Sequence, residues 1–238
     1  MTFKEIYDVA VPPAKRREEK FNLWVSIAVR PLSVLLTKPF LGTSIKPTQI
    51  TAFSLLCSII GFFVMSFTHT TTLKIIGWFF FFAWAVLDGV DGNYARCSKQ
   101  CSQLGDLWDT MGGYAAMVLM YFSSGIVAFS DNNLLYICDE YWYLILGGMC
   151  AVFSIFPRLV MHKKKSYGIS SEAVRVLSDK KTFGISQIIA MNLVSPSGFM
   201  QVILLLCILL HITNLYIGFY FILNFGIMCL SLYKLLRE

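Results

Sequence analysis

Long apolar runs of about 20 residues each, separated by short polar segments, dominate this chain of 238 residues. A helix needs about 20 apolar residues to cross the hydrocarbon core of a bilayer. Hydrophobic residues make up 56% of the chain, which leaves little sequence for a separate soluble domain. The sequence therefore predicts an all-α polytopic membrane protein with six transmembrane helices.

The six spans are expected at residues 47–67, 72–95, 104–129, 143–161, 185–211 and 212–236. Asn192, Pro196 and Gly198 interrupt the fifth run. Before the first span, residues 21–41 form an apolar run that contains two basic residues and two prolines. A charge at the centre of a span costs several kcal/mol, so this run favours an amphipathic helix lying at the interface. We therefore divide the chain into a cytoplasmic segment with an interfacial helix, 1–46, and a membrane domain, 47–238.

The formal charge of +6 does not indicate a nucleic-acid partner, because the excess Lys and Arg lie in short segments between the apolar runs. The connection after the fourth span contains six basic and two acidic residues, and the C-terminus is also basic. Cytoplasmic loops carry such an excess. Six spans with both termini in the cytoplasm agree with every basic segment. The seven cysteines are scattered without a disulfide pattern, and we expect them to be reduced.

Four aspartates lie within this apolar chain, in the stretch from residue 87 to 113. Asp88 and Asp91 are three residues apart, so they share a helix face, and Asp106 and Asp109 repeat this spacing at the start of the next apolar run. Buried carboxylates are costly unless they are paired or bind a cation. Oxygen ligands favour a hard cation, so we expect Mg²⁺ or Mn²⁺, one or two ions; Ca²⁺ has the same ligand preference.

Small and basic residues accompany the aspartates. Gly92 and Gly105 leave room for a ligand, and Arg96 follows one helical turn after Gly92. Arginine can hold two phosphate oxygens in a bidentate fork. A cation, glycines and an arginine together indicate a pyrophosphate site. Asp88 lies sixteen residues past Thr72, the start of the second span, which is roughly 24 Å along a helix, so the stretch is expected near one membrane interface. With six spans and both termini in the cytoplasm, that interface is the cytoplasmic one.

The stretch resembles the signature of the CDP-alcohol phosphotransferases. The matching residues, at the family's separations, are Asp88, Asp91, Gly92, Ala95, Arg96, Gly105 and Asp109. The resemblance implies a transferase that moves a phosphoalcohol or phosphatidyl group from a CDP-linked donor to a hydroxyl acceptor and releases CMP, in phospholipid or related lipid biosynthesis. It implies that Asp88, Asp91 and Asp109 bind the metal and that Gly92, Ala95, Arg96 and Gly105 contact the donor.

The start of the first span is similar to a second element of that family, which helps to hold the cytidine. Pro47 and Thr51 match this element, and Thr48 stands in place of an asparagine. The resemblance implies that these three residues bind substrate. The alternative is an ordinary helix start, where proline and threonine are common.

The chain departs from the family's pattern at Gly113, where the family has a fourth aspartate that binds metal and is the proposed general base. In one account, Asp106 is the base, because the choline and ethanolamine phosphotransferases carry a glutamate at the matching position. The alternative role for Asp106 is that of a carboxylate near a helix N-terminus, where the helix dipole stabilises it. In a second account, the protein is a non-catalytic homologue that binds CDP-lipid and divalent metal. In a third, Gly113 replaces an original aspartate and impairs the enzyme.

The sequence says less about which residues bind the acceptor. Arg158 and Lys163 are candidate acceptor-binding residues, although basic residues at the end of a span also serve topology or lipid headgroups. A cation transporter is the rival from another class, but transport sites lie near the midplane, whereas these aspartates lie near one interface. The resemblance also implies a possible homodimer.

Overall fold

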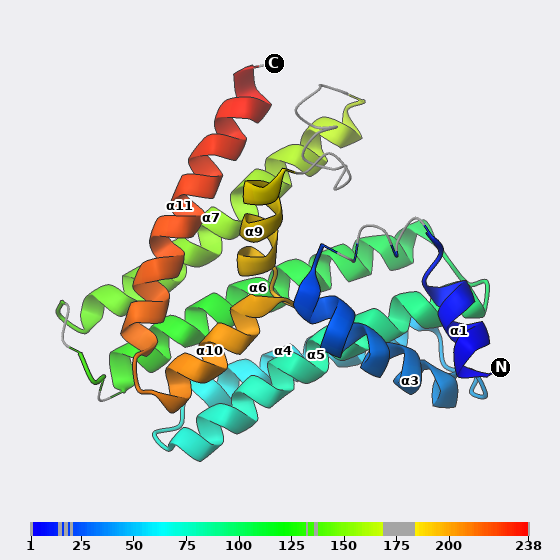
Figure 1. Cartoon of the computed structure of the whole chain (residues 1–238), viewed down its shortest axis with the longest axis horizontal. Helices are drawn as coiled ribbons and strands as arrows, with labels where there is room; N and C mark the ends of the chain where they lie inside the picture. The colour runs from blue at the N-terminus through cyan, green and yellow to red at the C-terminus, as the bar shows by residue number, and fades with distance from the viewer. Residues whose placement is uncertain are drawn as a thin grey trace.

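The computed structural model of the chain describes residues 2–13, 16, 19, 21–131, 133–135, 138–168 and 184–237, and of Ser186 only the backbone. Much of the basic connection after the fourth span lies outside these residues. The described part is all-helical, as predicted (Figure 1). Its helices are α1 (Phe3–Ala10), a π-helical segment (Val25–Val29), α3 (Arg30–Phe40), α4 (Pro47–Ser66), α5 (Thr71–Cys97), α6 (Gln103–Ser130), α7 (Tyr141–Ser166), α9 (Ile185–Val194), α10 (Phe199–Leu209) and α11 (Thr213–Arg237).

Five of the described helices are long and apolar enough to cross a membrane, namely α4, α5, α6, α7 and α11. The pair α9 and α10 meets the same criterion when it counts as one span, although it is bent by 55°. The described helices therefore supply five candidate spans, or six when this bent pair crosses as one broken span, which confirms the predicted polytopic all-α fold. The bend falls between Val194 and Phe199, where Pro196 removes a backbone donor from the helical ladder.

The described part of the N-terminal segment contains helical structure before the interfacial run as well as within it. The structure adds α1, which the sequence analysis missed, and places the interfacial run in the π-helical segment and α3. Thr2 caps α1, and its backbone N–H in turn donates to the Glu5 carboxylate (3.0 Å). α1 packs on α3 and α5, and α3 packs on α5 (Figure 1).

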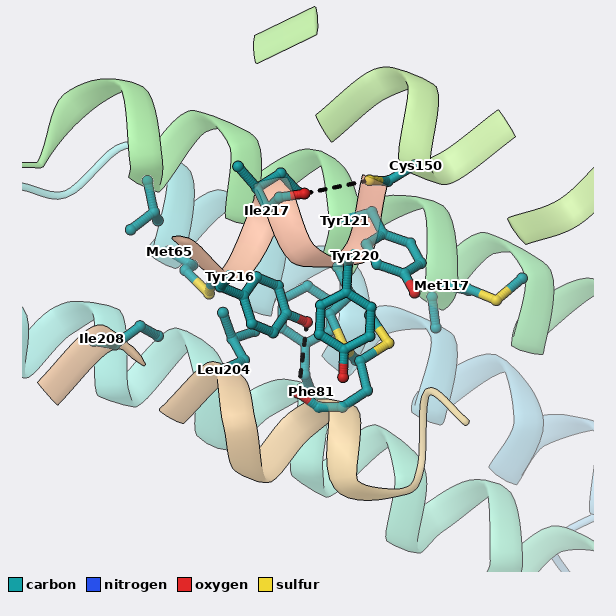
Figure 2. Packing of buried hydrophobic residues seen from close by; sticks show 14 of the residues in the cluster. Met65, Phe81, Met117, Tyr121, Cys150, Leu204, Ile208, Tyr216, Ile217 and Tyr220 are labelled. Atoms are coloured by element: carbon teal, nitrogen blue, oxygen red, sulfur yellow. Dashed lines mark hydrogen bonds between the residues drawn. The ribbon is translucent and has the colours of Figure 1, made fainter. Parts of the chain in front are cut away.

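The core is shared by all the long helices. α4 packs on α5 and α6, and α7 packs on α6 and α11. Large buried side chains from these helices and from α10 meet in one cluster (Figure 2). Close approach depends on small residues: the Cα of Gly125 on α6 lies 2.9 Å from where a Cβ on Gly147 of α7 would stand. This packing fixes the helix ends that carry the aspartates.

A polar cluster joins the helices at the end of the bundle away from the aspartates. Lys74 at the start of α5 lies 3.3 Å from Asp131, which follows α6, and both side chains are almost fully buried. His211, between α10 and α11, lies 3.4 Å from the same carboxylate oxygen. This cluster therefore ties α5, α6 and the α10–α11 connection together.

Candidate active site

A cavity of about 490 Å³ lies where the start of α4, the end of α5 and the start of α6 come together. Its lining comprises Lys46, Pro47, Thr48, Thr51, Asp91, Gly92, Ala95, Arg96, Gln100, Cys101, Ser102, Leu104, Gly105, Asp106 and Asp109. The structure thus brings into one cavity most of the residues singled out from the sequence. Its volume suits a small ligand or the headgroup of a larger one.

Asp91 is the most buried carboxylate of the cavity, with 4% of its surface exposed. The hydroxyl of Thr51 on α4 lies 2.5 Å from Oδ2 of Asp91 on α5 and donates a hydrogen bond to it. Thr51 is equally buried, because α4 and α5 pack closely along this line. A threonine in the first turns of α4 therefore fixes the orientation of a carboxylate that lies 40 positions later in the chain.

Asp106 and Asp109 reach the cavity from the first two turns of α6 and are exposed. Ser102 begins this helix: its hydroxyl accepts from the backbone N–H of Gly105 at 3.0 Å. Carboxylates near a helix N-terminus interact favourably with its dipole. The cavity therefore has one buried carboxylate on α5 and two accessible carboxylates on α6.

Asp88 differs from the other three aspartates. It is half-buried on α5, one turn before Asp91, and it is not part of the cavity lining. Within the described part of the chain, no three carboxylate, imidazole or thiol groups come close enough together to hold a metal ion by themselves. A cation here would need ligands from the substrate or from water in addition to the side chains.

The start of α4 is held in place by a residue that the sequence analysis did not single out. Tyr94 on α5 donates from its hydroxyl to the carbonyl oxygen of Ile45 at 2.8 Å. The next two residues are Lys46, whose N–H donates to the side chain of Gln49 (2.8 Å), and Pro47, the first residue of α4. Tyr94 thereby fixes the edge of the cavity where Lys46 and Thr48 lie.

Arg96 lines the cavity with its guanidinium group lying over Gly92. A Cβ on Gly92 would stand 3.3 Å from both terminal nitrogens of Arg96. Arg96 Nε donates to the carbonyl oxygen of Ala10 at 2.6 Å, and Nη2 donates to Oδ1 of Asn93 at 3.1 Å. Gly92 therefore leaves the space that this orientation of the arginine occupies.

Gly113 lies on α6 one turn beyond Asp109 and is half-buried. A Cβ added there would meet no atom within 4 Å. The site has room for a Cβ at this position, so packing does not require glycine. Its neighbour Gly112 faces α4, since a Cβ there would lie 3.9 Å from Thr51.

The two basic residues considered for an acceptor lie outside the cavity. Arg158 on α7 lines a second cavity of about 290 Å³ between α7, α9 and α11, and its Nη1 lies 3.2 Å from the sulfur of Met117. Lys163 is exposed, with its ammonium nitrogen 4.6 Å from the centre of the Tyr167 ring. The structure does not bring them together with the aspartates.

Five lining residues were not predicted from the sequence. Lys46, Gln100, Cys101, Ser102 and Leu104 belong to the cavity because the connections before α4 and α6 close it. The only local signal is Ser102, which precedes the helix as a capping residue. Gln100 reaches the cavity because Lys99 adopts a left-handed conformation (φ 57°) that ends α5 and turns the chain.

Comparison with known proteins assigns the chain to a family. The sequence pattern of the family described as CDP-alcohol phosphatidyltransferase matches residues 44–225, well over half of the chain. The match begins just before α4 and ends in the middle of α11, so it covers the whole cavity except for contacts from the N-terminal segment. No individual curated protein matches the chain. The chain belongs to the CDP-alcohol phosphatidyltransferase family.

Proposed function

We propose that the protein transfers a phosphoalcohol or phosphatidyl group from a CDP-linked donor to a hydroxyl acceptor, with release of CMP. The observation that carries this proposal is the single cavity in which Asp91, Arg96 and Asp109 meet. Membership of the family gives a membrane CDP-alcohol phosphotransferase as the general activity. The substrates within this class are proposals, with phospholipid or related lipid synthesis as the metabolic setting.

We assign the donor's cytidine to the α4 edge of the cavity, formed by Pro47, Thr48 and Thr51. Its pyrophosphate would then lie near Gly92 and Arg96, where no side chain projects from the glycine. Ala95 and Gly105 are small lining residues that leave the remaining space open. In this orientation Arg96 donates to a phosphate oxygen, and charge-assisted hydrogen bonds of this kind are among the stronger polar contacts.

The carboxylates suit a divalent cation in chemistry and in number. Mg²⁺ prefers oxygen ligands and is commonly bound by one or two carboxylates together with substrate phosphates and water. Asp91 and Asp109 line the cavity and would hold it. Asp88 lies outside the lining, one turn before Asp91, and we retain it as the third proposed ligand. When bound, Mg²⁺ or Mn²⁺ neutralises charge on the pyrophosphate and on departing CMP.

The transfer itself needs an aligned acceptor and a base. The acceptor hydroxyl oxygen forms a bond to the phosphorus distal to cytidine, and the bond from that phosphorus to the bridging oxygen of CMP breaks. We assign the proton to Asp106, which is exposed in the cavity on the first turn of α6. Gly113 has no group that could accept it.

The alternative is a chain that binds CDP-lipid and metal without turnover. Gly113 favours this alternative, because the position has room for a Cβ and the sequence supplies no acidic side chain there. The transferase and the binding-only protein would share the donor site, but only the transferase would have a functional base. Asp106→Asn separates them, since it should abolish CMP release without loss of CDP binding only if Asp106 is the base.

The orientation of the protein in the membrane and the residues that bind the acceptor are also proposals. If each long helix crosses once, the basic ends of α7 and α11 lie on the same side as the aspartates, which the positive-inside rule makes cytoplasmic. Arg158 and Lys163 remain candidates for the acceptor. Arg158 lies deeper in the protein than Lys163, beside Met117 on the helix that carries Asp109.

The test is release of CMP by the purified protein in detergent or nanodiscs with Mg²⁺ or Mn²⁺. CDP-diacylglycerol, CDP-choline and CDP-ethanolamine would each be supplied with a panel of hydroxyl acceptors. We expect CMP release that a chelator stops and that Asp109→Asn abolishes. No release from any donor, with CDP binding intact, would favour the binding-only alternative.

A further inference from the structure

One of the two groups that hold the arginine of the cavity comes from outside the family match. Ala10, whose carbonyl accepts from Arg96 Nε at 2.6 Å, belongs to α1, whereas the family match begins at residue 44. This contact spans 86 positions of the chain. The N–H groups of Nη1 have no hydrogen-bond partner among the described residues, so they remain for a ligand in the cavity.

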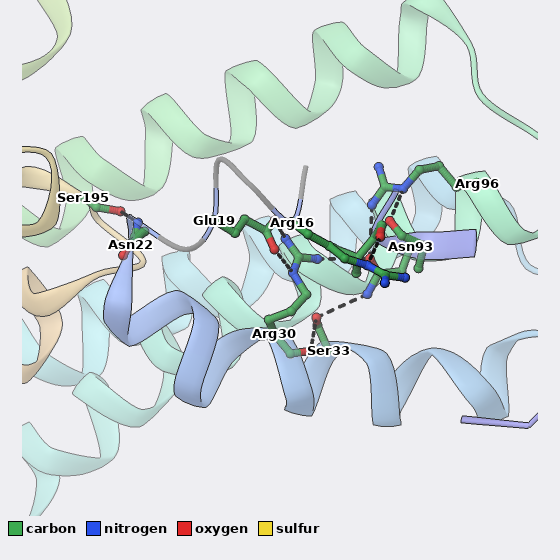
Figure 3. A network of polar contacts seen from close by, with 10 residues as sticks. Arg16, Glu19, Asn22, Arg30, Ser33, Asn93, Arg96 and Ser195 are labelled. Atoms are coloured by element: carbon green, nitrogen blue, oxygen red, sulfur yellow. Dashed lines mark hydrogen bonds and ion pairs between the residues drawn. The ribbon is translucent and has the colours of Figure 1, made fainter. Parts of the chain in front are cut away.

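Asn93 is the second support of Arg96 and is fully buried. Its Oδ1 accepts from Nη2 of Arg96 at 3.1 Å and from Nη1 of Arg30 at 3.0 Å (Figure 3). Its Nδ2 donates to the hydroxyl of Ser33 on α3 at 3.2 Å. The amide therefore joins the cavity arginine to α3 and uses both of its polar atoms to do so.

Arg30 is itself fixed by a carboxylate of the N-terminal segment. Its Nε donates to Glu19 at 2.8 Å, and Nη2 pairs with the other oxygen of the same carboxylate (Figure 3). A bidentate pair of this kind restricts the guanidinium in both position and angle. Arg30 can therefore offer Nη1 to Asn93 without bringing an uncompensated positive charge next to Arg96.

Packing holds the backbone carbonyl of Ala10 in place. Ile6, Ala10 and Val11 are fully buried and form one cluster with Val34 of α3, against which Cys97 of α5 packs. α3 in turn approaches α5 closely at Gly89, where a Cβ would stand 2.8 Å from the Cβ of Ser33. The acceptors around Arg96 are thus parts of a packed layer.

We propose that the N-terminal segment, through the Ala10 carbonyl and the Arg30–Asn93 pair, is a positioning device that directs Arg96 toward the donor's pyrophosphate. This inference rests on the proposed function, because it assumes that a CDP compound occupies the cavity. Asn93 is its central positioning residue. An arginine held before the ligand arrives loses less side-chain freedom on binding, so the affinity gained from its hydrogen bonds is larger.

The test is a double-mutant cycle on binding of CDP in Mg²⁺ buffer to the full-length protein. Arg96→Ala should weaken binding about tenfold or more, and Asn93→Ala several-fold. Asn93→Ala should have no further effect when Arg96 is already alanine, because the two residues act as a unit. Asn93→Asp keeps the acceptor oxygen and should bind CDP better than Asn93→Ala.

Ser33→Ala is the matched control, since it removes a hydrogen bond on the other side of the same amide and leaves the acceptor of Arg96 in place. It should change CDP binding little. If Asn93→Ala does not fold, Ile6→Asn provides the second variant, because it loosens the packing of α1 on α3 and α5 while leaving Asn93 and Arg96 unchanged. Ile6→Asn should also weaken CDP binding only when Arg96 is present.

Wild-type binding by Asn93→Ala, or an equal loss with and without Arg96, would overturn the inference while leaving the proposed function intact. Wild-type protein that neither binds CDP nor releases CMP would remove the proposed function and this inference together. A loss confined to chains that contain Arg96 would support the positioning role, because a purely structural defect does not depend on that arginine.

Discussion

The Thr51 hydroxyl donates to Oδ2 of Asp91 across 2.5 Å, and both side chains are 4% exposed. This bond joins the first turns of α4 to the last turns of α5 at the inner wall of the cavity. It links the element that we assign to cytidine with a carboxylate that we assign to the cation. Binding of the two parts of the donor is therefore expected to depend on one hydrogen bond.

Thr51→Val tests this dependence. The change keeps the shape of the side chain but leaves a buried carboxylate oxygen without its donor, which should lower the free energy of unfolding by about 1–3 kcal/mol. It should also weaken binding of CDP in Mg²⁺, measured by calorimetry. Thr51→Ser keeps the hydroxyl and is the control. Equal CDP affinity in Thr51→Val and wild type would show that the bond does not orient Asp91.

The proposed base can be tested by removing the carboxylate at residue 106 and introducing one at residue 113. Asp106→Asn should stop CMP release while CDP binding persists, because the amide cannot accept the proton. Adding Gly113→Asp should restore CMP release in this background, since a Cβ at residue 113 meets no atom within 4 Å and a carboxylate there can accept the proton. If Asp106→Asn alone releases CMP at the wild-type rate, Asp106 is not the base.

Two adjacent glycines of α7 should respond differently to alanine. A Cβ at Gly147 would lie 2.9 Å from Gly125 of α6, whereas one at Gly148 meets nothing within 4 Å. Gly147→Ala should therefore cost about 1–3 kcal/mol in the free energy of unfolding, as overpacking does. Gly148→Ala should be neutral or stabilising by up to about 1 kcal/mol. Unfolding in detergent measures both, and equal values would contradict the close α6–α7 packing.

The ion pair at the other end of the bundle should be costly to break. Lys74→Met leaves the Asp131 carboxylate buried without its ammonium partner, so we expect a loss of about 3–5 kcal/mol in the free energy of unfolding. The double change Lys74→Met and Asp131→Leu removes both charges and should recover much of that loss. A double variant no more stable than Lys74→Met would indicate that the pair does not carry the effect.

The helices were predictable because their apolar runs match the thickness of a bilayer. α4 begins at Pro47 as expected, since proline fits the first turn of a helix. α7 continues to Ser166, five residues past the predicted end at Met161, because lysines in its last turn interact favourably with the helix dipole. α1 was missed, although Thr2 and Glu5 form a capping box that the sequence contains.

The residues of the candidate site could be predicted only where they follow a fixed spacing along the chain. Asp91, Arg96 and Asp109 follow from fixed separations, and the structure brings all three into one cavity. The hydrogen-bond partners of Asn93 could not be predicted in this way, because Arg30 and Ser33 lie 63 and 60 positions away in the chain. Helix spacing predicts which residues share a face, but only packing shows which other helix that face meets.

The central claim is that one cavity binds a CDP donor and a divalent cation through α5 and α6. Its most direct test is an experimental structure of the protein with CDP and Mn²⁺, using the anomalous signal of manganese. We predict manganese at Asp91 and Asp109, with the pyrophosphate against Arg96 and cytidine toward Thr48. Manganese or nucleotide bound elsewhere, with this cavity empty, would contradict the account.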